Sequence, residues 1–331
     1  MKKTKLKNVA IVLAFPIGMF LIMELICAVG YSRHIFETSQ DVIDFFRKSS
    51  VSILASYALL LNMENGRMDM SLGGQKLIGC LVGGNLALSL GFGSIGVLVM
   101  GTVFGMVSGL LTGLLYVTLR IPAMVLGIGV ALVYEALSAA YAIDGFQLFG
   151  RSGMELLGNV WFITGVAIAV ILLMLLLIGH TKFGLHYKAI GSAQRIAKNS
   201  GINIYKSAVI CYALAGALIA ASGILDTGFN GYMTTQLNLS SVSIAFSGFV
   251  PVFVALFLQR WCNTILGVPV AVIIFRILSM GLTVMSLPSS ASTVITMSML
   301  LFFLVFTGKL GDISYKKLVK QRYDAVNKSA A

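Results

Sequence analysis

Long apolar runs recur along the whole chain, each of about the length that crosses a lipid bilayer as a helix. They lie near residues 9–30, 45–63, 70–91, 94–119, 122–142, 159–179, 207–226, 240–258, 263–284 and 290–307. A helix needs about 20 mostly apolar residues to cross roughly 30 Å of hydrocarbon. Lipid leaves backbone polar groups no partner outside the protein, so spanning segments are helices or closed barrels. The sequence therefore predicts an all-α, polytopic transmembrane helix bundle of about ten spans.

Composition supports one membrane domain over residues 1–331. Only 11% of the residues are charged and 58% are hydrophobic, whereas a soluble domain carries about 25% charged residues. The polar gaps are too short to bury a core of their own. The basic start "MKKTKLK" is typical of a signal peptide, but no small-residue cleavage site follows the long apolar run, so we expect a retained first helix. The limits of spans two and three are the least certain, because "NMENGRMDMSLGGQK" shortens both apolar runs.

The basic residues indicate how the chain is oriented. The formal net charge is +12, but the lysines and arginines alternate with apolar runs and form no continuous basic face, which argues against a nucleic-acid partner. With both termini in the cytoplasm, 18 of the 24 basic residues fall on the cytoplasmic side and 4 outside, as the positive-inside rule requires. We therefore expect both termini, and a short tail at 308–331, to be cytoplasmic.

The polar segment at 181–206 lies between the sixth and seventh predicted spans and contains no acidic residue. A connection of about 26 residues is longer than compact helical domains need, and such loops tend to be functional or disordered. Its apolar residues alternate with basic ones, which favours a short amphipathic helix ending near Ser200 and Gly201, where glycine suits the position after a helix. Two interpretations stay open from these residues: a surface for a partner, or a basic loop lying on lipid headgroups.

Small residues spaced four apart predict close helix packing. Gly101, Gly105, Gly109 and Gly113 share one face of the fourth span. Ala213, Ala217 and Ala221, with Gly216 and Ala220 beside them, give the seventh span a similar face. Because lipid provides no hydrophobic drive for association, membrane helices approach through such residues. We expect both faces to pack against other helices.

Ionisable residues at membrane depth are costly and usually face a cavity or each other. Glu24, Lys76, Glu135 and Arg276 are the candidates, and Glu24 lies near the outer interface. Glu135 and Arg276 fall in the middle of the fifth and ninth spans. We expect these two residues to pair or to line a polar interior.

The stretch "GRMDMSLGGQ" places Gly66, Asp69, Ser71 and Gly73 just before an apolar, glycine-rich run. Asp69 or Ser71 can accept hydrogen bonds from the free amides at a helix start, where an acid also meets the positive end of the helix dipole. Transporters also build polar sites on broken helices of this kind. Plain helix capping and a place on a translocation path are both consistent with the stretch.

No enzymatic or metal chemistry is indicated. The four cysteines lie in or beside separate apolar runs, and the three histidines lack ligand partners nearby. No Gly-x-x-x-x-Gly-Lys-Ser/Thr phosphate loop is present. We therefore expect a transport subunit without a cofactor, with any ATP hydrolysis on a separate partner subunit.

Three stretches resemble one family. "GRMDMSLGG" is similar to a Gly-x-x-Asp-Leu-Ser-x-Gly motif, and "LRIPAMVLGIG" to a Lys/Arg-x-Pro-Phe-x-x-Thr-Leu-Gly segment. "TKFGLHYKAIGSAQRIAKNSGINI" resembles the Thr-x-Phe-Gly-x-x-x-x-Ala-x-Gly-x-x-x-x-Ala-x-x-Ser-Gly-Ile segment. All three belong to the ribose-type and branched-chain-amino-acid-type permeases, the membrane subunits of ATP-binding-cassette (ABC) importers. The last match is the most specific, and together they span most of residues 60–226.

The resemblance implies a bacterial cytoplasmic-membrane permease that works as a pair, with a homodimer and a heterodimer both open. It implies a cytoplasmic ABC ATPase that receives the 181–206 loop, and an external or periplasmic binding protein that delivers a small solute such as a sugar, a nucleoside or a related polar metabolite. The residues it assigns to ATPase coupling are Phe183, Gly184, Lys188, Ala189, Gly191, Arg195, Ala197, Lys198, Ser200 and Gly201.

Departures from the family pattern concern the substrate. Met70 replaces the usual Leu after Asp69, and the Ile-Gly-Gly-Thr and Gly-Gly-x-Gly segments common after residue 240 are not found. The alternative is an ion-coupled secondary transporter, for which Asp69, Glu135 and Arg276 would be the coupling groups. A scaffold role fits the many glycine-rich spans poorly. The long patterned loop favours the importer, because a secondary carrier does not need to dock an ATPase.

Overall fold

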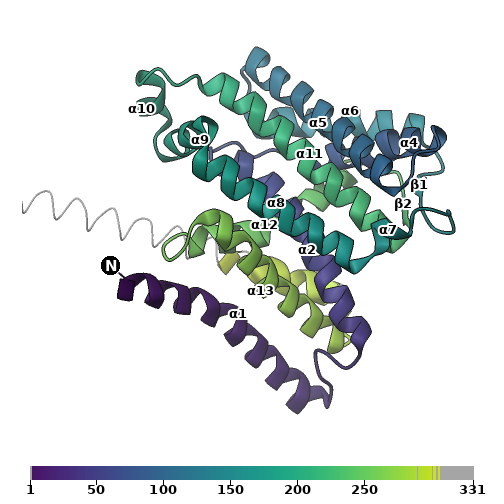
Figure 1. The fold of residues 1–331 in the computed structure, drawn as a ribbon, viewed down its shortest axis with the longest axis vertical. Helices are drawn as coiled ribbons and strands as arrows, with labels where there is room; N and C mark the ends of the chain where they lie inside the picture. The colour runs from purple at the N-terminus through teal and green to yellow at the C-terminus, as the bar shows by residue number, and fades with distance from the viewer. Residues whose placement is uncertain (1, 289, 300, 303–304, 306–331) are drawn as a thin grey trace, which may run out of the picture.

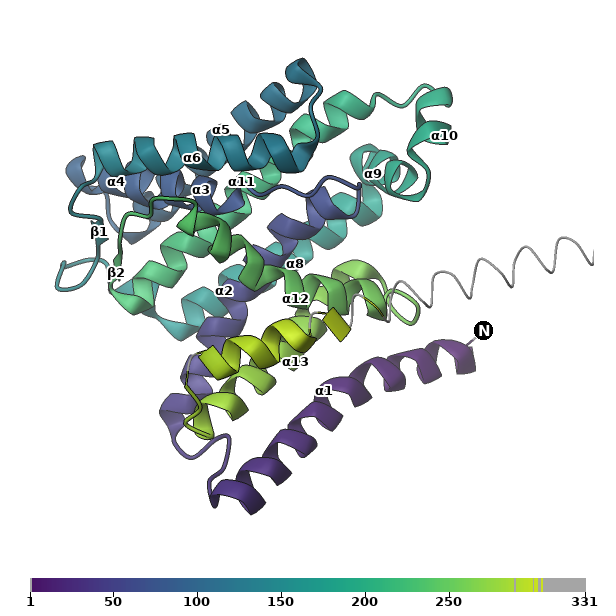
Figure 2. The same ribbon diagram turned by 180° about the vertical axis from the view of Figure 1, so that it is seen from behind.

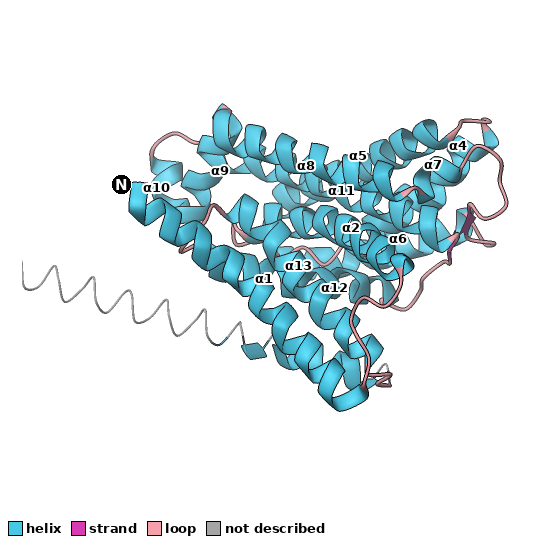
Figure 3. Ribbon diagram, turned by 60° about the horizontal axis from the view of Figure 1, so that its bottom comes forward, coloured by secondary structure: helices cyan, strands magenta, loops and turns pink. Residues whose placement is uncertain are grey.

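The computed structural model describes residues 2–288, 290–299, 301, 302 and 305, and most of them are helical (Figure 3). The elements are α1 (Lys2–Tyr31), α2 (Ser39–Met63), α3 (Leu72–Leu77), the π-helical η1 (Ile78–Gly84), α4 (Asn85–Ser89), α5 (Ser94–Leu119), α6 (Ala123–Tyr141), β1 (Phe146–Gln147), α7 (Glu155–Gly158), α8 (Val160–His180), α9 (Lys182–Ser192), α10 (Gln194–Asn199), α11 (Ile204–Asn230), β2 (Tyr232–Met233), α12 (Ser240–Leu258) and α13 (Thr264–Val284). The prediction of an all-α bundle is confirmed.

The helices follow the predicted apolar runs closely. Helix α5 matches the predicted 94–119, and α12 matches the predicted 240–258. The third predicted span, 70–91, is one helical stretch in three parts, α3, η1 and α4. For the tenth predicted span, 290–307, the described residues 290–299 are helical. Residues 300, 303–304 and 306–307 of that span lie outside the described residues, and so does the whole predicted tail at 308–331.

Within the described residues, seven helices are long and apolar enough to cross a membrane. They are α5, α6, α8, α11, α12, α13 and residues 12–31 of α1. Helix α2 falls outside this group although it has 25 residues, because its first half carries Asp41, Asp44, Arg47 and Lys48. The 72–89 stretch falls outside it because the π turn interrupts its α-helix. The count of about ten spans is therefore approximate, whereas the multi-pass membrane bundle is not in doubt.

The bundle has two distinguishable ends. Helices α9 and α10 lie at one end, and α7 and the two short strands lie at the other (Figures 1 and 2). We call these the segment end and the strand end. The strands pair antiparallel, with Phe146 opposite Met233 and Gln147 opposite Tyr232. Helix α2 runs through the interior, where buried side chains of α2, α11, α12 and α13 form the largest apolar core.

Helices α5 and α11 pack directly on each other through the predicted small faces. A Cβ added at Gly105 would lie 2.2 Å from the Ala220 Cβ, and one added at Gly109 would lie 2.2 Å from the Tyr212 carbonyl oxygen. A side chain at either position would force the backbones apart, so glycine is required for this approach. The prediction of close packing through these faces is confirmed.

Helix α1 lies along the outside of the bundle against α13 (Figure 1). Met23 and Cys27 of α1 and Ile35 after it are buried with Leu278 and Leu282 of α13. At the end of this helix, the Glu24 carboxylate accepts hydrogen bonds from the Ile35 amide at 3.0 Å and from the His34 ring. Glu24 is therefore partnered near the helix end, away from the bundle centre.

Candidate functional site

The 181–206 segment folds into two short helices at the segment end. The Thr181 hydroxyl accepts a hydrogen bond from the Gly184 amide at 3.2 Å and caps α9. Helix α9 ends before Ala193, and the short helix α10, which has 6 residues, follows it. Gly201 has a φ of +82° and ends the second helix, as predicted. The Asn203 side chain then accepts the Lys206 amide at 3.0 Å and starts α11. The sequence indicated one short helix here, and the structure has two because Ala193 is extended.

The predicted coupling residues divide into an exposed and a buried set. Lys188, Gly191, Arg195, Lys198, Ser200 and Gly201 are exposed, Gly184 and Ala197 are buried, and Phe183 and Ala189 are partly buried. Two large apolar side chains are also presented to solvent: Leu185 is 66% exposed and Ile196 is 68% exposed. Exposed apolar side chains surrounded by basic ones are typical of a surface that receives a partner.

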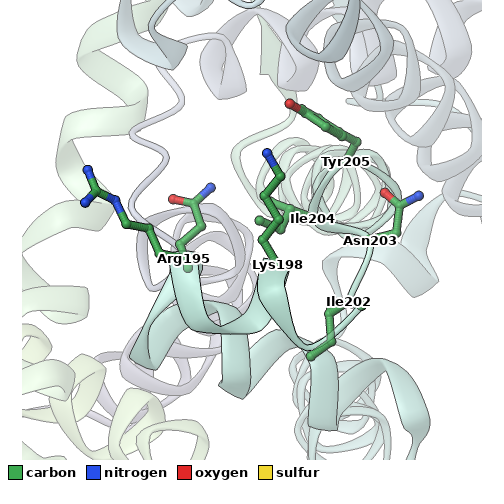
Figure 4. A pocket seen from close by; sticks show the side chains of 8 residues that line it. Arg195, Lys198, Ile202, Asn203, Ile204 and Tyr205 are labelled. Carbon is green, nitrogen blue, oxygen red and sulfur yellow. The ribbon is translucent and has the colours of Figure 1, made fainter.

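A cavity of about 440 Å³ opens between α10 and the start of α11. Its wall includes Arg195, Lys198, Asn203 and Tyr205 and contains no acidic residue. Figure 4 shows the Lys198 side chain rising from α10 on the side where Tyr205 lies at the start of α11. The wall is basic at Arg195 and Lys198 and apolar at Ile202 and Ile204, so this cavity suits an acidic group on a partly apolar segment of a partner.

The buried face of α9 rests on the end of α2. Tyr187 is fully buried, and its hydroxyl shares its proton between the Glu64 carboxylate at 2.9 Å and the Leu60 carbonyl oxygen at 3.1 Å. A Cβ added at Gly191 would lie 3.1 Å from the Glu64 carbonyl oxygen, so α9 also approaches the α2 backbone closely. Burial raises the pKa of the Glu64 carboxyl, although the Tyr187 hydrogen bond opposes that rise. The sequence analysis did not single out Tyr187 or Glu64.

Residues 64–71, which we call the buried connection, lead from α2 to α3 inside the protein. Gly66 turns the chain with a φ of +73°. The buried Asp69 carboxylate accepts the Ser71 amide at 2.9 Å, the Ser71 hydroxyl at 2.6 Å and the Gln75 amide group at 3.3 Å. Asp69 therefore closes the turn that precedes α3, in keeping with the capping interpretation. Ser71 occupies the N-cap position but makes no side-chain cap bond.

Gly73 brings α3 against the start of α12. A Cβ at Gly73 would lie 1.9 Å from the Ser241 carbonyl oxygen. The buried Glu135 carboxylate of α6 accepts the Leu239 amide at 2.9 Å and the Ser241 amide at 2.8 Å, so it caps α12 from another helix. Leu239 itself is left-handed, with a φ of +63°, and provides no cap.

The prediction that Glu135 and Arg276 pair directly is wrong. Arg276 instead donates to the Ser52 hydroxyl at 3.1 Å and the Lys48 carbonyl oxygen at 3.4 Å, both on α2. The reason is that the start of α12 supplies Glu135 with two backbone donors, which periodicity along single helices does not reveal. Whether either residue lines a solute path stays a prediction.

A buried ion pair joins Lys76 of α3 to Asp226 of α11, with 2.8 Å between the ammonium nitrogen and the nearer carboxylate oxygen. The Lys76 side chain is 9% exposed. A Cβ at Gly223 would lie 2.7 Å from Cγ of Lys76, so this glycine makes room for the lysine stem. Sequence reasoning noted Lys76 but not Asp226. The signal available was an acid inside an otherwise apolar run, "GILDTG".

Clusters of three or more His, Cys, Asp or Glu side chains that could hold a metal ion are absent from the described part of the chain. Most of its ionisable interior residues bond to protein groups, whereas the buried Arg67 guanidinium makes no hydrogen bond to nitrogen or oxygen.

Comparison with known proteins places these features in a family. A family model described as "Branched-chain amino acid transport system / permease component" matches residues 42–304. The autoinducer 2 import system permease protein LsrC of Yersinia pseudotuberculosis (strain IP 31758) is 25% identical over 315 residues, covering 92% of this chain and 88% of that protein. LsrC of Yersinia pestis (strain Pestoides F) is 24% identical over the same shares. No solved structure matches. The chain belongs to the branched-chain amino acid transport system permease family, and it is a membrane permease subunit of an ABC importer.

Proposed function

We propose that the 181–206 segment docks on a cytoplasmic ABC ATPase and that ATP-driven movement of the ATPase transports a small polar solute. The observation that carries this proposal is the composition of the exposed surface of α9 and α10. It presents Lys188, Arg195 and Lys198 around the apolar Leu185 and Ile196, with a basic cavity beside them. A loop adapted only to lipid headgroups would not need two folded helices, the first of them capped by Thr181.

The solute is a sugar, a nucleoside or a related polar metabolite in this proposal. Inside the described bundle, Lys76 bonds Asp226 and Glu135 bonds two backbone amides, whereas the buried Arg67 guanidinium makes no hydrogen bond to nitrogen or oxygen. Acids that are already bonded to protein groups leave little to bind a cationic solute, which favours a polar metabolite without positive charge. The relatives compared above are named as autoinducer 2 import permeases, so autoinducer 2 is the first solute to test.

The remaining partners follow from the family. We propose one transmembrane domain in a bacterial cytoplasmic membrane with both termini in the cytoplasm, which places the segment end inside and the strand end outside. An external binding protein would deliver the solute to the strand end. A second permease, identical or related, would pair with this chain. One face of α6 is available for that contact or for lipid, since Val125, Leu132, Val133 and Leu137 are exposed.

Co-purification with the ATPase tests docking directly. Lys198→Asp should weaken recovery of the ATPase at least about tenfold, because one reversed charge at an interface costs upward of about 1.4 kcal/mol. Arg33→Asp is the matched control, because Arg33 is exposed after the end of α1, outside the 181–206 segment, and this variant should leave recovery unchanged. Equal recovery with both variants would contradict docking through this surface.

Uptake by reconstituted vesicles separates the importer from a secondary carrier. We expect uptake to require ATP and to continue after the proton and sodium gradients are collapsed. Uptake without any ATPase that stops on collapse of either gradient would favour the ion-coupled alternative, with Asp69, Glu135 and Arg276 as its coupling groups.

A further inference from the structure

The firmest link between the 181–206 segment and the rest of the bundle runs through one side chain. Among the described residues, the side-chain hydrogen bonds that α9 and α10 make to a long helix other than the adjoining α8, or to the residue that caps it, come from Tyr187. One reaches Leu60 in the last turn of α2, and the other reaches Glu64, the residue that follows this helix. The tyrosine ring is fully buried, and its face of α9 also buries Gly184 and Ile190. A displacement of α9 must therefore move the end of α2 or break these bonds.

The end of α2 leads straight into the interior. Glu64 begins the buried connection, in which Asn65, Arg67 and Asp69 are all at least nine-tenths buried. Four residues lie between Glu64 and Asp69, and Asp69 fixes the start of α3 through Ser71. Helix α3 carries Lys76, which is bonded to α11. The connection thus joins the 181–206 segment to the helices around the bundle centre.

The buried connection and the adjoining α3 hold polar atoms whose hydrogen bonds are not made. Across the described residues, no hydrogen bond is formed by Oδ1 of Asn65, by Oε1 of Gln75, or by the three guanidinium nitrogens of Arg67 to nitrogen or oxygen. The Arg67 guanidinium lies beside the Cys211 thiol of α11. Its two nearest acids in sequence bond elsewhere, Glu64 to Tyr187 and Asp69 to Ser71. Unsatisfied buried groups are unfavourable, so a rearrangement that gives them partners is favoured when α2 moves.

We propose that Tyr187 is the positioning residue through which movement of α9 reaches the buried connection, and that its hydroxyl bond to Glu64 carries this movement. The inference rests on the proposed docking of the 181–206 segment on an ATPase. It adds the route from that surface into the bundle: Tyr187, Glu64 and then Asp69 with α3. Hydrogen-bond acceptance by Glu64 is what matters in this route, whereas its charge is not required.

Tyr187→Phe is the central test, because it keeps the buried ring and removes only the hydroxyl. The complex of permease, ATPase and binding protein is reconstituted, and solute uptake and ATP hydrolysis are measured together. We expect the ratio of solute moved to ATP hydrolysed to fall about tenfold, within the range typical of coupling between sites. ATPase recovery and the solute concentration for half-maximal uptake should stay unchanged, while the maximal rate falls.

Glu64 provides the second pair of variants. Glu64→Gln keeps an acceptor oxygen and should retain the wild-type ratio within about twofold, whereas Glu64→Leu should match Tyr187→Phe. Tyr31→Phe is the control, since Tyr31 is 45% exposed at the end of α1. If Tyr187→Phe does not fold, the contrast between Glu64→Gln and Glu64→Leu decides the question alone.

Three results would overturn the proposal: a wild-type ratio in Tyr187→Phe, equal losses in Glu64→Gln and Glu64→Leu, or loss of ATPase recovery as the cause of the defect. Failure of the proposed function itself looks different. In that case the unmutated chain recovers no ATPase and shows no ATP-dependent uptake.

Discussion

Replacing Gly109 of α5 with alanine tests the packing on which the bundle depends. The added Cβ would lie 2.2 Å from the Tyr212 carbonyl oxygen and 3.0 Å from its carbonyl carbon. Ordinary contact begins near 3.4 Å, so α5 and α11 must separate locally by about 1.2 Å. Both obstructing atoms belong to the backbone, which cannot turn aside as a side chain can. The separation then weakens contacts all along this helix pair.

The magnitude follows from two opposing effects. Overpacking of this kind costs about 1–3 kcal/mol, and a gap of 0.5–1 Å forfeits a quarter to a half of the local dispersion attraction. Alanine is favoured over glycine inside a helix by about 1 kcal/mol. We therefore expect Gly109→Ala to lower the free energy of unfolding by up to about 2 kcal/mol.

Gly165→Ala on α8 is the matched control. A Cβ there would meet nothing within 4 Å, so only the helix preference acts and stability should stay equal or rise by up to about 1 kcal/mol. Both variants are measured in one detergent by SDS-induced unfolding, followed by circular dichroism. Shifts of the same sign and size would show that α5 and α11 do not meet at Gly109.

Three further predictions concern the ion pair, the helix cap and the orientation. Lys76→Met and Asp226→Asn should each lower the free energy of unfolding by about 2 kcal/mol, a value reduced because the Asp226 side chain is 29% exposed. The double variant should lose less than the sum of the two single losses, and additive losses in unfolding measurements would refute the ion pair. Glu135→Ala should cost about 1–2 kcal/mol and speed hydrogen exchange at the first amides of α12, and unchanged exchange there would count against the cap. In a cysteine-free background, Lys198→Cys should react with an impermeant maleimide only from the cytoplasm and Arg151→Cys only from outside, and the reverse pattern would invert the proposed orientation.

Local sequence pattern predicted the spans well because apolar length is a local property. The limits of α5 and α12 agree with the apolar runs, and the glycine spacing on α5 identified its packing face. The turn at Gly201 was also predictable, since the residue after a helix favours glycine when φ is positive.

The contacts between helices were not predictable in the same way. Glu135 was paired with Arg276 because both are charged and central in their spans, yet its partners are backbone amides of α12. Such donors have no trace in the residue types at 239 and 241. Tyr187 was overlooked because a tyrosine in a basic, polar loop gives no sign of being fully buried. Which groups a buried side chain bonds to on other helices depends on how the helices are arranged in space, and the pattern of residues along one sequence does not reveal that arrangement.

The wide turn at Ile78–Gly84 has a mechanical consequence for the third span. A π turn contains one residue more than the α-helix around it, and each residue of an α-helix turns the chain by about 100°. If the π turn moves along the helix past a given residue, that residue rotates about the helix axis by about 100°, and the helix stays continuous. Lys76 lies before this turn and Asn85 after it. Only the residues that the surplus residue passes would rotate, so side chains between Lys76 and Asn85 would change face while both ends of the span keep their orientation.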